Sequence, residues 1–143
     1  MIFKPELVEK ILAGEKTMTR RPVKRVLTTD EDGNEWTNVA ICRYRVGYTY
    51  AVQPGWGQKG VARIKVTSVR RERWQDISPE DAVAEGFGPW NPEREARRVP
   101  VDRFADYVRG LYPDLNPASE CWVIEFKPVP AQSPEAGNQG EAG

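Results

Sequence analysis

The sequence predicts a single α+β domain in which about three helices flank a small set of strands. The chain has 143 residues, of which 39% are hydrophobic, and five of them are Trp, so it carries enough apolar area for one core. An apolar helix pattern near the N-terminus runs directly into a strand pattern. Alternating strand-like stretches occupy the middle and the end of the chain, and two further helical segments stand between them.

The first element is a short helix over residues 5–12. Pro5 suits a first helical turn. Gly14 fits the left-handed residue that ends a helix. Apolar residues at helical spacing predict one buried face made by Leu7, Val8, Ile11 and Leu12.

The residues directly after this helix gather cations and hydroxyl groups. Lys16 stands in the turn, followed by Thr19 and Arg20. Arg21 precedes Pro22, which favours an extended conformation, so Thr19 and Arg21 fall on one face of a strand. This concentration at a helix exit suggests a functional site. The alternative is a helix cap followed by a solvated basic strand, because charge runs usually lie at the surface.

Strand patterns follow over the next part of the chain. Residues 23–28 and 36–44 flank a turn signal at residues 30–34, which predicts a hairpin or a surface insertion. Residues 46–53 form a further β-branched and aromatic stretch that a Pro-Gly pair ends. Residues 61–69 predict a strand with a basic face and a buried face, the latter made by Ala62, Ile64, Val66 and Ser68.

A second helix is expected to begin at the cap residue Ser78, with proline at its first position, and to end at Gly86. Glu85 then lies in the last turn, where the helix dipole disfavours a carboxylate by about 0.3–1 kcal/mol. Another group is therefore expected to stabilise it. That group is either a surface arginine or a facing Lys16, which would form a titratable cluster with Thr19 of the kind found in active sites.

The rest of the chain holds a loop, a helix, a strand and a tail. Residues 87–98 form a Gly-, Pro- and Trp-bearing loop, and residues 101–111 form a helix between two prolines, with Phe104, Tyr107, Val108 and Leu111 as its apolar positions. Residues 121–126 close the domain as a strand with Trp122, Ile124 and Phe126 on one face. Residues 130–143 have the composition of a disordered tail.

The absence of histidine excludes several kinds of site. Ser-His-Asp and Cys-His catalysis, histidine metal ligands and imidazole proton transfer all need this residue. Cys42 and Cys121 lie far apart without a CxxC pair, so we expect reduced, buried thiols and neither a zinc site nor a disulfide framework. The chain has neither GxGxxG nor GxxxxGK[ST]. We therefore expect no metal and no cofactor.

Charge and hydropathy restrict location and partners. The chain has no run of about 18 apolar residues, and its first residues carry charge where a signal peptide needs an apolar stretch, so we expect a soluble cytoplasmic protein that does not bind membranes. The formal net charge is zero, but basic residues cluster at 16–25, 63–73 and 94–103. This clustering allows a local positive groove.

Three blocks of the sequence resemble the ASCH domain (activating signal cointegrator homology), a PUA-like β-barrel family. They are ILAGEKTMTRR, ARIKVTSVRRERWQDISPEDAVAEGF and WVIEFKPV, and the first holds the signature GxKxxTxR at residues 14–21. The resemblance implies a PUA-like (ASCH) small β-barrel with about three flanking helices over residues 1–129, within which residues 28–60 follow the family poorly. The middle and end blocks look most like small ASCH proteins of bacteria and their phages.

The resemblance also implies a cleft that faces a nucleobase or RNA. Some members of the family are amidohydrolases that remove an acetyl group from acetylated cytidine. The residues matching their catalytic set are Lys16, Thr19 and Glu85, and Arg21 completes the signature. Thr19 would act as nucleophile or water-positioning hydroxyl, Lys16 as its base, and Glu85 as proton donor or orienting group. The pKa of Lys16 must then fall by roughly 2 to 3 pH units from about 10.4.

Two other classes of function stay open. In an RNA-binding module or endoribonuclease, Trp56 or Trp90 would stack on bases, and basic side chains would hold phosphates, namely Lys16, Arg20, Arg21 and Arg63. In a non-catalytic interaction domain, the Trp36 hairpin or the proline-rich tail would make the contacts. The expected partner is a nucleoside or single-stranded RNA, and the oligomeric state is not determined by these patterns.

Overall fold

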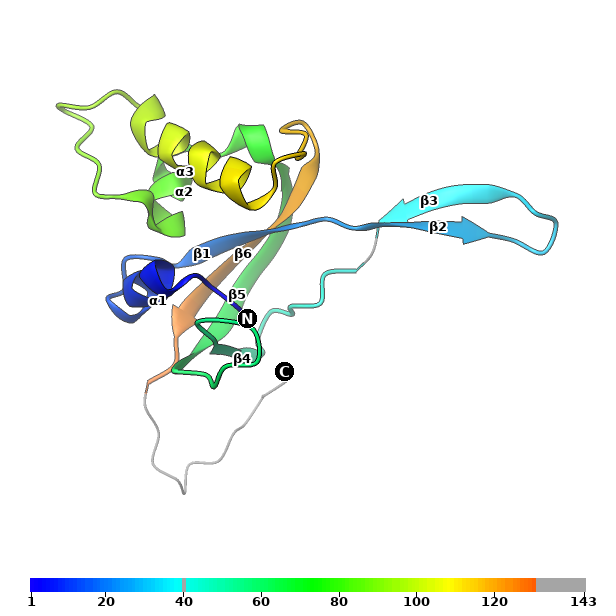
Figure 1. Ribbon diagram of the computed structural model, residues 1–143, viewed down its shortest axis with the longest axis horizontal. Coiled ribbons are helices and arrows are strands. Elements are labelled where there is room, and N and C mark those ends of the chain that lie inside the picture. Colours follow the sequence, from blue (N-terminus) through cyan, green and yellow to red (C-terminus); the bar gives the residue numbers. More distant parts are fainter. Residues whose placement is uncertain (40, 131–143) are drawn as a thin grey trace, which may run out of the picture.

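The computed structural model of the chain describes residues 1–39 and 41–130, so the expected tail lies, after Pro130, outside the described residues. The secondary-structure elements follow the expected α+β order (Figure 1). They are α1 (Pro5–Leu12), β1 (Met18–Pro22), β2 (Arg25–Thr29), β3 (Glu35–Val39), β4 (Thr49–Val52), β5 (Ala62–Arg73), the turn η1 (Trp74–Asp76), α2 (Pro79–Ala82), the wide turn η2 (Val83–Phe87), α3 (Arg98–Leu111) and β6 (Glu120–Pro128).

Four strands form one antiparallel sheet in the order β1-β6-β5-β4. The N-terminal residues extend its β4 edge, because Phe3 N–H donates to the Gln53 carbonyl and Gln53 N–H donates to the Met1 carbonyl. Helices α2 and α3 lie together over one end of the sheet, and α1 lies beside β1 (Figure 1). Over the described residues the sheet does not close into a barrel, so that part of the expected fold is not confirmed.

The central strand β6 divides the core in two, because its alternate side chains point to opposite faces of the sheet. Ile124 and Phe126 pack in a cluster with α1 and the N-terminal residues. Cys121 and Val123 pack in a second cluster with α2 and α3. Ile124 and Phe126 thus share one face, as the alternation predicted, and both faces of the strand are covered.

A β-bulge in β5 reverses which of its side chains face each cluster. Val66 pairs with Phe126, whereas Ser68 pairs with Glu125. Val66 therefore faces the α1 cluster, and Ser68 faces the opposite side, which corrects the expectation that both share the buried face. After the bulge, Glu72 pairs with Cys121 and so lies on the side of α2 and α3.

The second helix begins as predicted, because the Ser78 hydroxyl accepts a hydrogen bond of 3.0 Å from the Asp81 N–H. Its regular part is short, and the chain continues into the wide turn η2 instead of a longer α-helix. Gly86 lies inside this turn with φ of +108°, a left-handed conformation that L side chains disfavour. Glu85, the residue before it, also belongs to the turn and is buried.

The N-terminal helix closely follows its predicted bounds. Leu7, Val8 and Ile11 are buried, and Gly14 has φ of +78°, as expected for the residue that ends the helix. Leu12 is 59% exposed, so the predicted buried face was one residue too wide. Helix α3 begins at Arg98, three residues before the predicted start.

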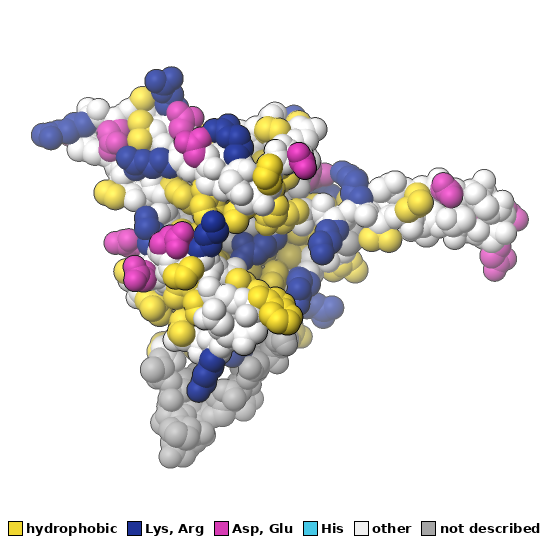
Figure 2. All heavy atoms as spheres, viewed as in Figure 1, with side chains coloured by type: hydrophobic (Ala, Val, Ile, Leu, Met, Phe, Trp, Pro, Cys, Tyr) yellow, Lys and Arg dark blue, Asp and Glu magenta, His cyan; other side chains and the backbone are white. Residues whose placement is uncertain are grey.

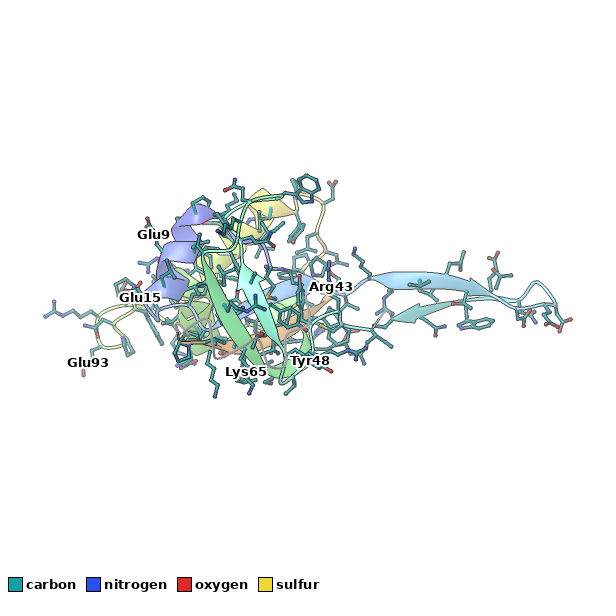
Figure 3. All side chains as sticks on the ribbon, turned by 90° about the horizontal axis from the view of Figure 1, so that it is seen from below. Glu9, Glu15, Arg43, Tyr48, Lys65 and Glu93 are labelled. Carbon is teal, nitrogen blue, oxygen red and sulfur yellow. The ribbon has the colours of Figure 1, made fainter. Side chains whose placement is uncertain are left out.

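Strands β2 and β3 form a separate hairpin that projects from the domain (Figures 1 and 3). This arm, residues 25–39, confirms the predicted hairpin, although the second strand ends at Val39 rather than at residue 44. Acidic residues gather at its tip (Figure 2), and Leu27 and Trp36 are exposed along it. In the described part of the chain, no helix combines the length and the apolar character needed to cross a membrane.

The left-handed glycine in η2 gives a direct test of this local structure. We predict that Gly86→Ala lowers the free energy of unfolding by about 1–2 kcal/mol, because the new Cβ would hold a strained φ and lie 3.3 Å from Leu7 Cδ2. Urea unfolding measures the change. Gly110→Ala is the control: it lies in α3 with nothing near its Cβ and should be neutral or stabilising, so equal losses in both variants would contradict the prediction.

Candidate functional site

A cavity of about 210 Å³ opens between β1, the N-terminal residues, η2 and α3. Polar groups and aromatic rings line it together. The polar side chains are those of Lys16, Thr19, Arg20, Arg21 and Glu85, and the rings include those of Phe3, Trp74, Phe104 and Tyr107. Because β1 is an edge strand, side chains from both of its faces reach this one cavity. In the space-filling view, Lys and Arg side chains gather in the hollowed middle of the face (Figure 2).

Lys16 reaches the cavity through the turn that Gly14 allows. The following residue, Thr17, is fixed because its N–H donates to the Ala84 carbonyl and its carbonyl accepts from the Phe126 N–H. The Lys16 ammonium is buried and donates to the Met18 carbonyl and the Glu85 carbonyl, both at 2.7 Å. Burial lowers the pKa of Lys16 to about 8, with Glu85 opposing and Arg21 adding to this effect.

Glu85 is buried with both carboxylate oxygens in contact with cations. Its Oε2 accepts a hydrogen bond of 2.9 Å from Arg20 Nη1, and its Oε1 lies 3.5 Å from Lys16 Nζ. The carboxylate is 4% exposed. The sequence left two partners open for Glu85, a surface arginine or Lys16. In the structure Glu85 contacts Lys16, and the arginine that it also contacts, Arg20, is buried.

Arg20 is the second buried cation of the site, after Lys16. Its guanidinium contacts three carboxylates: Glu85 at 2.9 Å, Glu72 at 3.1 Å and Asp81 at 3.3 Å. Burial alone would lower the pKa of Arg20, but nearby acidic groups, Glu85 foremost and Glu72 among them, outweigh it and raise the pKa. Arg20 was grouped with the binding residues on its sequence pattern, yet its guanidinium faces carboxylates inside the protein rather than solvent.

Thr19 and Arg21 lie on the other face of β1, as their alternation predicted. Arg21 Nη1 donates a hydrogen bond of 2.6 Å to Thr19 Oγ1, and Arg21 Nη2 donates to the Ile2 carbonyl at 2.9 Å. The guanidinium carbon lies 5.1 Å from the centre of the Phe3 ring. Thr19 is buried, whereas Arg21 is half-buried and stands at the opening of the cavity.

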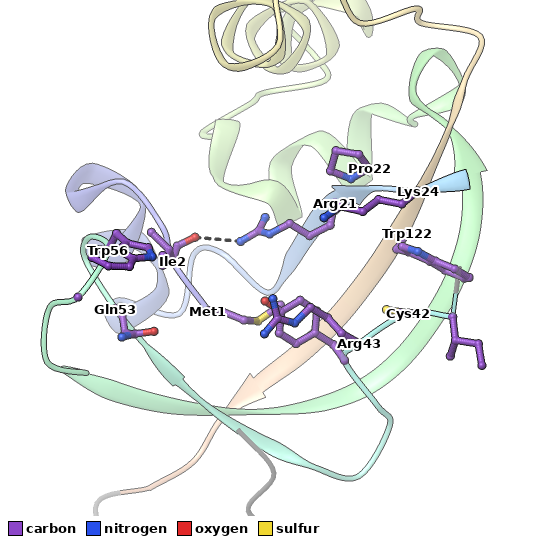
Figure 4. Close-up of a pocket in the computed structure, with 13 residues that line it drawn as sticks. Met1, Ile2, Arg21, Pro22, Lys24, Cys42, Arg43, Gln53, Trp56 and Trp122 are labelled. Carbon is purple, nitrogen blue, oxygen red and sulfur yellow. Dashed lines mark hydrogen bonds between the residues drawn. The ribbon is translucent and has the colours of Figure 1, made fainter. Parts of the chain in front are cut away.

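A wider, open groove of about 620 Å³ adjoins this opening. Arg21 and Ile2 line both the groove and the cavity. Figure 4 shows Trp56 on one side of the groove and Trp122 on the other, with Arg43 between them and Arg21 reaching in from β1. Trp56 is 89% exposed.

The structure therefore brings together most of the sequence-predicted residues. Lys16, Thr19, Glu85, Arg20 and Arg21 meet at the cavity, and Trp56 lies in the adjoining groove. Arg63 lies apart on β5, where it donates to the Thr49 hydroxyl at 3.2 Å.

Both cysteines are buried and unpaired by disulfides, as expected. Burial raises the pKa of Cys121 to about 12, so its thiol stays protonated near neutral pH and is a poor nucleophile. Over residues 1–39 and 41–130, no group of three or more Cys, Asp or Glu side chains is placed to hold a metal ion.

The sequence analysis did not predict several residues of the site. Glu72 and Asp81 are ordinary charged residues of a strand and a helix start, and only the fold places them beside Arg20. Trp74 and Phe104 stack with their ring centres 6.3 Å apart on the cavity wall. A signal for Asp81 existed in the Ser78 cap motif, which fixes its backbone, but that signal names no partner.

We predict that Arg20→Met lowers the free energy of unfolding by about 3–5 kcal/mol, because Glu85 would remain buried beside an apolar side chain. Urea unfolding of both proteins measures the difference. Arg109→Met is the control, since Arg109 pairs with Asp106 on the surface and should change stability by less than about 1 kcal/mol. A loss below about 1 kcal/mol in Arg20→Met would show that the buried network is not stabilising.

Comparisons with known proteins identify the family and the fold. The family model described as the ASCH domain matches residues 1–130. Protein EF3133 from Enterococcus faecalis is 19% identical, with a TM-score of 0.52 over 86% of this chain and 69% of that one. A crystal structure described as hypothetical protein PH0355 is 18% identical, with a TM-score of 0.52 over 90% of this chain and 96% of that one. An ASCH domain from Lactobacillus crispatus is 21% identical, with a TM-score of 0.48 over 85% and 69%.

These structural likenesses concern the fold alone. No curated protein matches the chain. The family match spans all the elements described above and includes the three blocks that resembled the family in sequence. The chain therefore belongs to the ASCH domain family.

Proposed function

We propose that this ASCH domain binds a single nucleobase in the cavity and hydrolyses an acyl group from a modified cytidine-type nucleoside. One observation carries the proposal. Lys16 lies just before β1, Thr19 lies in β1, and Glu85 lies in η2, far along the chain, yet all three line one cavity with aromatic walls. A cavity with a few convergent polar groups and a lysine of lowered pKa is a reasonable candidate for an active site.

The reaction is the hydrolysis of an amide. A water oxygen attacks the acyl carbon, the bond from that carbon to the exocyclic nitrogen breaks, and the nitrogen leaves with a proton as the amine. The developing oxyanion needs a positive neighbour. Arg21 stands at the opening and binds Thr19 Oγ1, so the hydroxyl and the guanidinium can act together on the acyl oxygen or the attacking water.

Lys16 would be the general base. With a pKa of about 8, about one Lys16 side chain in ten is neutral at pH 7, which is far more than for an exposed lysine. Its two short hydrogen bonds use the two protons that a neutral amine keeps. Among the described residues Lys16 makes no hydrogen bond to Thr19, so a base acting on water, with Thr19 positioning that water, fits better than a threonine nucleophile.

Glu85 would act as an orienting group. Arg20 binds one of its oxygens and Lys16 lies beside the other, so the carboxylate fixes the ammonium within the cavity. The proton donor for the leaving nitrogen would then be the protonated Lys16, after it has taken the proton from water.

The first test is the pH dependence of deacylation of acetylated cytidine. We predict that the rate rises with pH and levels off above an apparent pKa of about 8, because only neutral Lys16 accepts a proton. Lys16→Met should abolish turnover, and Thr19→Ala should lower it by about 100-fold or more. Product is followed by chromatography.

Lys65→Met serves as the matched control, because Lys65 is exposed on β5 outside the cavity. It should leave the rate and the pH profile unchanged. Turnover that persists in Lys16→Met would remove Lys16 from the mechanism. A wild-type protein that deacylates no nucleoside would end the hydrolase proposal.

A second candidate function is the binding of single-stranded RNA, and the open groove favours it. The groove continues the cavity through Arg21, carries Lys24 and Arg43, and presents an exposed Trp56. Cations track phosphates and exposed aromatic rings stack on bases in proteins that bind single strands. If one base of the strand occupies the cavity, the adjacent nucleotides would lie in the groove.

We predict that Arg43→Gln weakens the binding of a short single-stranded RNA and makes its affinity less dependent on salt, with the slope reduced by about 0.7. Trp56→Ala should weaken binding at every salt concentration, because it removes a stacking surface. Fluorescence anisotropy at several salt concentrations measures both effects. Arg109→Gln, outside the groove, is the control, and unchanged binding in Arg43→Gln would exclude the groove as the RNA site.

A further inference from the structure

The arm exposes apolar side chains that the core of the domain does not cover. Val26 is 49% exposed, Leu27 63% and Trp36 43%. Within the described part of the chain, neither core cluster includes a residue of β2 or β3. A two-stranded hairpin is only marginally stable by itself in water. Large apolar side chains on such a projecting hairpin therefore indicate a contact with another molecule.

The strand register divides these side chains between the two faces of the arm. Thr28 pairs with Trp36, and Val26 pairs with Asn38. Paired residues of antiparallel strands point to the same side, so these four form one face, here called the Trp36 face. Asn38 Nδ2 donates to Thr28 Oγ1 at 3.3 Å across this face. Leu27 lies on the opposite face.

The charges of the arm separate along its length. Glu31 and Asp32 are exposed at the tip, in a turn where Asp30 Oδ1 accepts the Asp32 N–H at 2.9 Å. Lys24 and Arg25 are exposed at the base, and Figure 2 shows both the acidic tip and the basic side chains near the base. The length of β2, about 14 Å by strand rise, exceeds the Debye length of about 8 Å at physiological ionic strength. The tip and the base of one arm therefore interact little with each other.

We propose that the Trp36 face docks on the same face of a second copy of this chain, with the two arms antiparallel about a two-fold axis. Parallel arms would bring two acidic tips together, whereas antiparallel arms place each tip at the basic base of the partner. Residues 24 and 32 each lie four positions from Thr28, so the axis passes near Thr28. Trp36 pairs with Thr28 and therefore lies at the centre of the contact, where a buried tryptophan contributes most to affinity.

This self-association is independent of the proposed function, because it needs neither substrate nor RNA. Sedimentation equilibrium of the full chain, freed of nucleic acid and measured from about 5 to 500 µM, should show a reversible dimer. Trp36→Thr keeps a strand-forming residue but removes the central apolar side chain, so it should weaken the dimer by at least about tenfold. Leu27→Thr is the matched control, since it makes the same change on the opposite face and should leave the association unchanged.

Charge exchange tests the antiparallel arrangement. Glu31→Lys and Lys24→Glu should each weaken the dimer by about fivefold, because each places like charges at both contacts between tip and base. An equimolar mixture of these two variants should recover the wild-type affinity, since opposite charges then meet at both contacts.

Three outcomes would overturn the proposal. They are a wild-type protein that stays monomeric over the whole concentration range, equal losses in Trp36→Thr and Leu27→Thr, and a mixture of the charge variants that associates no better than either alone. A monomeric wild type that binds RNA more weakly after Trp36→Thr would also overturn it and would assign the arm to RNA.

Discussion

The buried guanidinium of Arg20 is the contact on which the rest of the site depends. It joins edge strand β1 to strand β5 through Glu72, to helix α2 through Asp81 and to the turn η2 through Glu85. A charge taken out of water is tolerated only when partners with good geometry replace the lost hydration. The sheet and the helical layer must therefore meet in one relative position, and that position leaves the cavity between them.

This arrangement depends in turn on the β-bulge in β5. Ahead of the bulge, Val66 faces the α1 cluster, and without the extra residue Glu72 would share that face because side chains alternate along a strand. The bulge turns Glu72 to the opposite face, towards Arg20. The same strand thus contributes apolar side chains to one core cluster and a carboxylate to the other, and β6 serves both clusters by simple alternation.

The local parts of the site could be predicted from sequence, and the long-range parts could not. Gly14 and the Ser78 cap act through their own backbone, so the turn that delivers Lys16 and the helix start before Glu85 follow from short patterns. The partners of Arg20 lie 52 to 65 residues away, and charged residues of such strands usually face solvent. The position of the bulge decides which face of the sheet Glu72 lies on, and no short sequence pattern predicts that position. The stacking of Trp74 on Phe104 likewise depends on how α3 lies over the sheet.

The ion-pair network also sets the chemistry of Lys16. Glu85 alone would raise the pKa of Lys16 and keep the ammonium charged, which would oppose its use as a base. Arg20 holds one oxygen of that carboxylate at 2.9 Å, whereas Lys16 lies 3.5 Å from the other, so the arginine takes the larger part of the interaction. Burial then prevails, and the pKa of Lys16 stays near 8. Arg21 adds to the effect of burial, and Arg20 adds less than Arg21, so the two neighbouring arginines of β1 both favour the neutral form of the proposed base.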